Sequence, residues 1–190
     1  AELERLRTRS ENALSVLEQR IRGGDSQLHF HNANSMFDVA RLLGDALREV
    51  KSRDGAYLMQ NNIDSSASFI VGGQIRGEPP RLFHVYNEGN FIEATAETCY
   101  FQIGETKYGK PIIDRVVNRR TTLTDAVKCT MVSFDSTMRS NISVGLPIDL
   151  CVYEHDALRI KFLRCVDEDD PYFQMVHTQW GEGLRRVFAQ

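Results

Sequence analysis

The segment from Phe134 to Leu150 constrains the fold of this chain more than any other, because its character changes three times. Its first part continues a helical stripe of apolar residues, which recur at Leu123, Val127, Met131, Phe134 and Met138. Residues 139–145 then form a polar stretch whose short side chains favour a turn. Residues 148–153 are rich in β-forming types and predict a short strand. The segment therefore predicts a helix, a turn and a strand in close order, with hydroxyl groups at the lip of a sheet.

The residues alone leave two interpretations of this polar turn open. Functional sites are often built from small polar groups on turns that rigid elements hold in place. The structural alternative is an ordinary αβ loop whose serines cap a helix end and a turn.

The other periodicities of the sequence predict helices and antiparallel strands in alternating groups. Helices are expected at 2–21, 35–51, 109–119, 122–138 and 172–190, and strands at 66–75, 81–86, 90–94, 98–103, 148–153 and 158–163. Asn34 or Ser35 can cap the second helix, and Thr122 starts a pattern similar to a capping box. Gly44 costs its helix about 1 kcal/mol relative to Ala, so we expect a neighbour packed closely against it. This order suits an α+β fold with helices on the outer faces of antiparallel sheets.

Composition and charge exclude several classes of function. The 190 residues show ordinary globular composition, which predicts one domain, and a formal charge of −3 gives no case for nucleic acid or an anionic membrane. No apolar run approaches the ~20 residues that span a bilayer. The four cysteines are far apart and predict buried free thiols in a reducing cytosol. His29 and His31 alternate but lack acidic or cysteine partners nearby, so neither a metal nor a cofactor is expected. The acidic run before Pro171 is interpreted as a helix N-terminus.

Three stretches carry a family resemblance, namely Ile103–Pro111, Phe134–Ser140 and Gly145–Asp149. Phe37–Val50 and the C-terminal helix are similar to the same family, so the likeness covers most of the chain from about residue 12 onward. These stretches resemble Anbu, a bacterial relative of the proteasome β-subunit and of HslV within the N-terminal-nucleophile hydrolases. The resemblance implies a four-layer αββα sandwich, which agrees with the order of helices and strands above.

The resemblance also implies a reaction. In this family a Thr, Ser or Cys at the processed N-terminus attacks the peptide carbonyl, and its own α-amine, with a pKa of ~7.7–8.0, helps to take the proton. No residue here matches that nucleophile, nor the lysine, aspartate and oxyanion glycine of the family's first strands. Ala1 has no nucleophilic atom, and Thr8 and Ser10 lie inside a charged helical segment. We therefore expect a single proteasome-type domain over residues 1–190 that lacks the initial strands and is inactive by itself.

What the resemblance does carry over is a supporting set of residues around the terminal amine. Residues 139–143 align with the family's Arg-Asp-x-x-Ser turn, so that Arg139 matches the arginine and Ser143 the serine. Ser140 stands where the family has aspartate, which removes a charge. Thr106 lies in the turn that corresponds to the family's Gly-Ser-Gly loop, although the match is poor.

Two classes of function remain open. The first is a cytoplasmic threonine-type endopeptidase subunit that hydrolyses peptides or unfolded proteins and assembles with copies of itself into a ring or related multimer. The second is a non-catalytic assembly or binding subunit of such a homo-oligomer. A generic small-molecule-binding α+β domain fits the physics alone but leaves the family-like stretches unexplained.

Overall fold

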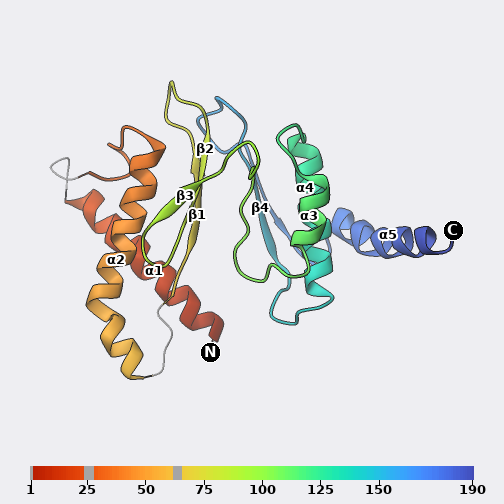
Figure 1. Cartoon of the computed structure of the whole chain (residues 1–190), viewed down its shortest axis with the longest axis horizontal. Coiled ribbons are helices and arrows are strands. Elements are labelled where there is room, and N and C mark those ends of the chain that lie inside the picture. Colours follow the sequence, from red (N-terminus) through yellow and green to blue (C-terminus); the bar gives the residue numbers. More distant parts are fainter. Residues whose placement is uncertain (1, 24–27, 62–65) are drawn as a thin grey trace. The chain divides into compact units, whose positions relative to one another are not determined.

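The structure, a computed structural model, describes residues 2–23, 28–61 and 66–190. The chain forms two compact units, Ala1–Ala94 and Thr95–Gln190, which are described separately. Their elements are α1 (Glu2–Arg22), α2 (Met36–Gln60), β1 (Phe69–Gly73), β2 (Arg81–Val85), β3 (Phe91–Glu93), α3 (Lys110–Val116), α4 (Leu123–Met138), β4 (Ile148–Val152), β5 (Phe162–Val166) and α5 (Pro171–Phe188) (Figure 1). The predicted combination of helices with antiparallel strands is confirmed, and the sheets have only three and two strands among the described residues.

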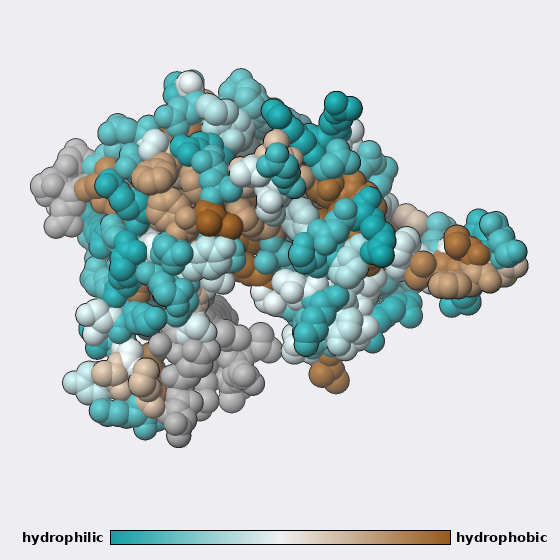
Figure 2. Space-filling view, in the orientation of Figure 1, coloured by the Kyte–Doolittle hydropathy of each residue, from teal (hydrophilic) through white to brown (hydrophobic). Residues whose placement is uncertain are grey.

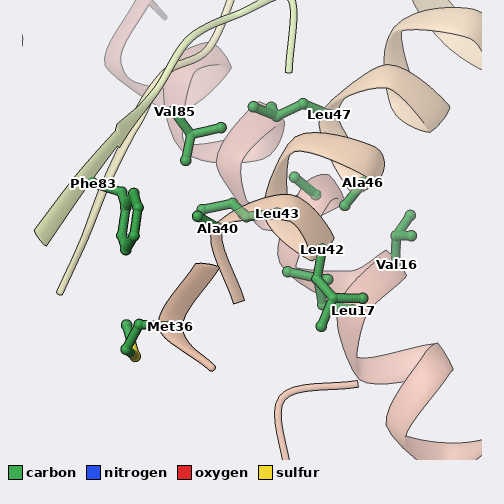
Figure 3. Close-up of a cluster of buried hydrophobic side chains, with 11 residues drawn as sticks. Val16, Leu17, Met36, Ala40, Leu42, Leu43, Ala46, Leu47, Phe83 and Val85 are labelled. Carbon is green, nitrogen blue, oxygen red and sulfur yellow. The ribbon is translucent and has the colours of Figure 1, made fainter. Parts of the chain in front are cut away.

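The first unit is built in layers. Its three strands form an antiparallel sheet in the order β1-β2-β3, with Val71 opposite Phe83 and Val85 opposite Phe91. Side chains alternate along a strand, so one face of this sheet is apolar and lies against α2, while α1 packs against α2 (Figures 1 and 3). The buried cluster comprises Ala13, Val16, Leu17, Met36, Ala40, Leu42, Leu43, Ala46, Leu47, Phe83 and Val85.

The start and the middle of α2 follow the expected local rules. Ser35 is the N-cap, and its Oγ accepts a hydrogen bond of 3.1 Å from the backbone N–H of Asp38. A Cβ added at Gly44 would lie 2.1 Å from the carbonyl oxygen of Gly89, so the predicted close neighbour is present. The helix continues past Lys51 to Gln60, further than its apolar stripe indicated.

This close approach generates a stability prediction. Gly44→Ala should lower the free energy of unfolding by about 1–3 kcal/mol, because the added methyl group meets backbone that cannot turn away. The matched control is Gly55→Ala in the same helix, where the new Cβ meets only the flexible side chain of Lys51 at 3.6 Å. That variant should gain up to about 1 kcal/mol from helix propensity. Urea denaturation measures both, and equal effects of the two substitutions would contradict the packing argument.

The second unit pairs a two-stranded antiparallel sheet with α4 and α5. In the hairpin, Ile148 lies opposite Val166 and Leu150 opposite Arg164. Its buried cluster comprises Met131, Ile148, Val166, Phe173 and Val176. Thr122 caps α4 as predicted, and Asp170 caps α5 through two hydrogen bonds of 2.9 Å from the backbone N–H groups of Tyr172 and Phe173. The acidic run before Pro171 therefore begins a helix, as the sequence indicated.

Two predicted strands of the second unit are wrong or displaced. Residues 98–103 form no strand, and within them the hydroxyl of Tyr100 is bound by Lys110 and Asp114 of α3. The strand expected at 158–163 begins at Phe162 instead, and Leu158 has a positive φ, which an extended strand cannot include.

The prediction of buried thiols is also wrong for two cysteines. Cys129 is buried, but Cys151 and Cys165 are exposed because they lie on the face of the hairpin opposite to Ile148 and Leu150. In the part of the chain that the structure describes, no helix is long and apolar enough to cross a membrane.

Candidate functional site

The polar turn after α4 is held by backbone hydrogen bonds. The N–H of Arg139 donates to the carbonyl of Asp135 at 3.1 Å, and the N–H of Asn141 donates to the carbonyl of Thr137 at 2.8 Å. The N–H of Val144 closes the turn on the carbonyl of Asn141 at 3.2 Å. Helix, turn and strand follow one another as the segment predicted, so the position of the turn is set by a rigid element on each side.

Ser143 lies exposed in this turn and bonds to a side chain that the sequence patterns did not indicate. Its backbone N–H and its Oγ both donate to Oδ1 of Asn141, at 2.8 and 2.6 Å. Ser140 is also exposed, and its backbone N–H donates to the carbonyl of Thr137 at 3.0 Å. The turn therefore presents a fixed hydroxyl at its surface.

A second turn of the same unit reaches the first one. Nδ2 of Asn141 donates to Oε2 of Glu105 at 2.9 Å, and the other carboxylate oxygen accepts from the N–H of Lys107 at 2.9 Å. These two hydrogen bonds, that of Lys107 first, hold the pKa of Glu105 below its usual range. Thr106 lies in this turn, and its carbonyl accepts from the N–H of Lys110. The structure thus brings together the turns of Thr106 and Ser143, which the family resemblance assigns to one site.

Arg139, the fourth predicted residue, follows α4, and its side chain contacts α5. Its guanidinium donates to the carbonyl of His177 at 3.1 Å, and Nε lies 3.5 Å from Oδ2 of Asp135. A longer approach of 3.4 Å joins the same guanidinium to Nε2 of the His177 ring. The backbone of Arg139 begins the turn, whereas its charge serves the contact between α4 and α5.

This contact contains a buried carboxylate that was not among the predicted site residues. Asp135 is only 1% exposed, and its Oδ1 lies 2.5 Å from Nδ1 of His177, whose side chain is 54% exposed. The two residues border a pocket of about 550 Å³, which is also lined by Met138, Arg139, Leu146, Glu168, Phe173, Gln174 and Thr178. The sequence does contain a signal for this buried carboxylate. Asp135 follows Met131 by four residues and so lies on the apolar side of the predicted helix.

The chemistry available here is hydrogen bonding and proton positioning. Among residues 2–23, 28–61 and 66–190, no three His, Cys, Asp or Glu side chains are grouped so that they could hold a metal ion. The paired turns offer one exposed hydroxyl, one amide and one carboxylate in a connected chain. Such a set can orient a small donor group that approaches Ser143.

Three solved structures are similar to this chain over 96% of its length. Anbu (ancestral beta-subunit) from Yersinia bercovieri is 46% identical, with a TM-score of 0.89 and 75% of that chain covered. Anbu from Hyphomicrobium sp. strain MC1 is 42% identical, with a TM-score of 0.88 and 75% covered. The helical assembly of the Anbu complex from Pseudomonas aeruginosa is 45% identical, with a TM-score of 0.88 and 74% covered. No protein-family model and no curated protein matches the chain.

The fold defined by these matches is that of a proteasome β-subunit-like protein. At this identity and coverage the chain belongs to the Anbu family, which confirms the resemblance carried by its sequence stretches. It is shorter than the chains of the solved structures that it matches.

The buried carboxylate leads to a second stability prediction. His177→Ala should lower the free energy of unfolding by about 1–3 kcal/mol, because Asp135 stays buried after losing a close partner. His155→Ala is the matched control, since it removes an imidazole 3.0 Å from Asp156 where both side chains are more than half exposed. That exposed pair should change stability by less than about 1 kcal/mol. Thermal or urea unfolding compares the two, and equal losses would show that the burial of Asp135 does not matter.

Proposed function

We propose that this chain is a proteasome-type peptidase subunit that hydrolyses peptide bonds with an N-terminal Thr, Ser or Cys nucleophile. The observation that carries the proposal is the junction of the two turns, where Asn141 links the Ser143 turn to the turn that contains Thr106. On this proposal the terminal amine of the nucleophile lies next to these turns, as the family resemblance implies. Ser143 would orient that amine, which acts as the base that takes the nucleophile's proton.

On this proposal the nucleophile itself lies outside residues 1–190. None of the 190 residues matches it, and the chain covers only about three quarters of its solved relatives. We propose that residues 1–190 form most of one proteasome-type domain, whose complete form is a four-layer αββα sandwich. The 190 residues alone then do not cleave peptides, and peptides or unfolded proteins are the substrates of the complete subunit in the cytoplasm. No cofactor is required, because the amine supplies the base.

Self-association is the second part of the proposal, and a specific surface supports it. Large apolar side chains are exposed along α5, most of all near the C-terminus (Figure 2). They are Tyr172, Met175, Leu184, Val187 and Phe188. Apolar residues gathered on one helix are typical of an interface, and the relative from Pseudomonas aeruginosa is described as a helical assembly. A non-catalytic assembly subunit would use the same surface, and the two turns would then have no part in catalysis.

Ser143→Ala tests the peptidase proposal in the complete gene product. The rate of peptide hydrolysis should fall by about 10²-fold, because an acid–base group loses the residue that orients it. The matched control is Ser52→Ala, which removes an exposed serine hydroxyl on α2 and should leave the rate unchanged. Hydrolysis of fluorogenic peptides gives both rates. Full activity of Ser143→Ala, with assembly intact, would rule out the role of this serine.

The oligomer is tested by light scattering at micromolar concentration. The complete gene product should be a homo-oligomer whose contacts each bury at least ~1,000 Å². Val187→Glu on α5 should shift it toward smaller species, because a charge would enter an apolar contact. Met59→Glu is the control, since Met59 is a comparably exposed apolar residue at the end of α2. A wild-type protein with the mass of one chain would contradict the proposal.

A further inference from the structure

Asn141 occupies the central position between the two turns, and every polar atom of its side chain has a partner. Oδ1 accepts from the N–H of Ser143 at 2.8 Å and from its Oγ at 2.6 Å. Nδ2 donates to Oε2 of Glu105 at 2.9 Å. The amide therefore connects a carboxylate to a hydroxyl through consecutive hydrogen bonds.

The direction of each of these hydrogen bonds follows from the chemistry of the partners. A backbone N–H can only donate, so the atom that faces the N–H of Ser143 must be the amide oxygen of Asn141. An ionised carboxylate can only accept, so the atom that faces Glu105 must be the amide nitrogen. These two constraints agree on one orientation of the amide. Because its oxygen cannot donate, the Ser143 hydroxyl must direct its own proton at Asn141.

Glu105 holds this orientation in place. One of its carboxylate oxygens accepts a hydrogen bond from the N–H of Lys107 and the other accepts one from Asn141. These two bonds fix the orientation of the carboxylate. A glutamate carboxyl with its ordinary pKa is already ionised at neutral pH, and these bonds lower the pKa of Glu105 further. An ionised Glu105 leaves Asn141 no alternative orientation, since turning the amide would place its oxygen against a carboxylate.

The exposed side of the Ser143 hydroxyl offers only hydrogen-bond acceptors to an approaching group. A hydroxyl has one proton and two lone pairs, and the proton is used by Asn141. Ser143 is exposed, so an approaching group meets only the lone pairs. Such a hydroxyl accepts from N–H groups but cannot donate to the lone pair of an amine.

We propose that Asn141 and Glu105 are positioning residues that hold the Ser143 hydroxyl as an acceptor for the N–H groups of a primary amine. This inference rests on the proposed function, in which the amine is the terminal amine of the nucleophile. An amine that donates an N–H to Ser143 keeps its own lone pair free for the nucleophile's proton. After the transfer the resulting ammonium still donates to the same oxygen, so one contact serves both protonation states.

The test compares Asn141→Ala and Glu105→Gln in the complete gene product with Asn118→Ala. Asn118 is the matched control because its Oδ1 likewise accepts a backbone hydrogen bond, from Arg120 at 2.9 Å, in an exposed turn of the same unit. Two quantities are measured, namely kcat and KM with fluorogenic peptides and the pKa of the terminal amine. The amine pKa comes from the pH dependence of its acylation, followed by mass spectrometry of the N-terminal peptide.

In Asn141→Ala, kcat should fall about tenfold, which is the effect of losing one hydrogen bond. KM should change by less than about twofold, because the turns orient the amine and not the substrate. The amine pKa should fall by about half a unit or more, since a fixed acceptor favours the ammonium form. Glu105→Gln should change kcat and the amine pKa in the same directions but less, and Asn118→Ala should match the wild type.

The two proposals fail in different ways. If the wild type cleaves peptides but Asn141→Ala and Glu105→Gln behave like Asn118→Ala in kcat and amine pKa, the positioning role is overturned. If the wild type does not cleave peptides, the proposed function is wrong, and the amine pKa then decides the inference by itself. A lower amine pKa in Asn141→Ala supports it, and an unchanged pKa overturns it. Glu105→Gln keeps the test valid if Asn141→Ala does not fold.

Discussion

The contact between Gly109 and α4 is the constraint on which the candidate site depends. A Cβ at this position would lie 2.2 Å from Oγ of Ser133 and 3.0 Å from Oγ1 of Thr137. Both of these residues are buried, and Thr137 is bonded to the carbonyl of Ser133, so neither can move aside cheaply. Only glycine lets the start of α3 lie this close to α4. Because Gly109 lies only three residues after Thr106, this approach brings the turn of Glu105 and Thr106 to the end of α4.

Local rules of the sequence account for most of the helices, because the residues that begin them act on their own backbone. Ser35 and Thr122 each bond the third residue of the helix they start, and such a pattern is visible without knowledge of the fold. The strands were harder to predict. Residues 98–103 have the composition of a strand, but Tyr100 is bound by side chains of α3, a contact that no local pattern indicates. Leu158 was expected to begin a strand but has a positive φ, which is uncommon for this residue type.

The sequence indicates the two turns of the candidate site but not the residues that connect them. Ser143 is indicated only by the likeness of its stretch to a family. Asn141 and Glu105 are 36 residues apart, and only folding shows that an amide and a carboxylate are partners. Asp135 and His177 are 42 residues apart, and for the same reason the sequence does not indicate their contact. Periodicity predicts which face of a helix is buried, but it does not identify the distant partner of a polar residue on that face.

The departure at Ser140 has a physical counterpart in the second turn. The family resemblance implies an aspartate at this position, and serine removes its charge from the turn of Ser143. Glu105 supplies a carboxylate from the neighbouring turn, and Asn141 transmits its effect because an amide donates at one end and accepts at the other. A carboxylate placed directly beside an amine would attract the proton by its charge. A carboxylate two hydrogen bonds away acts mainly by fixing the direction of a hydroxyl, so orientation replaces part of the charge. On the proposed function, the Ser143 hydroxyl then favours one arrangement of the amine without holding it permanently protonated.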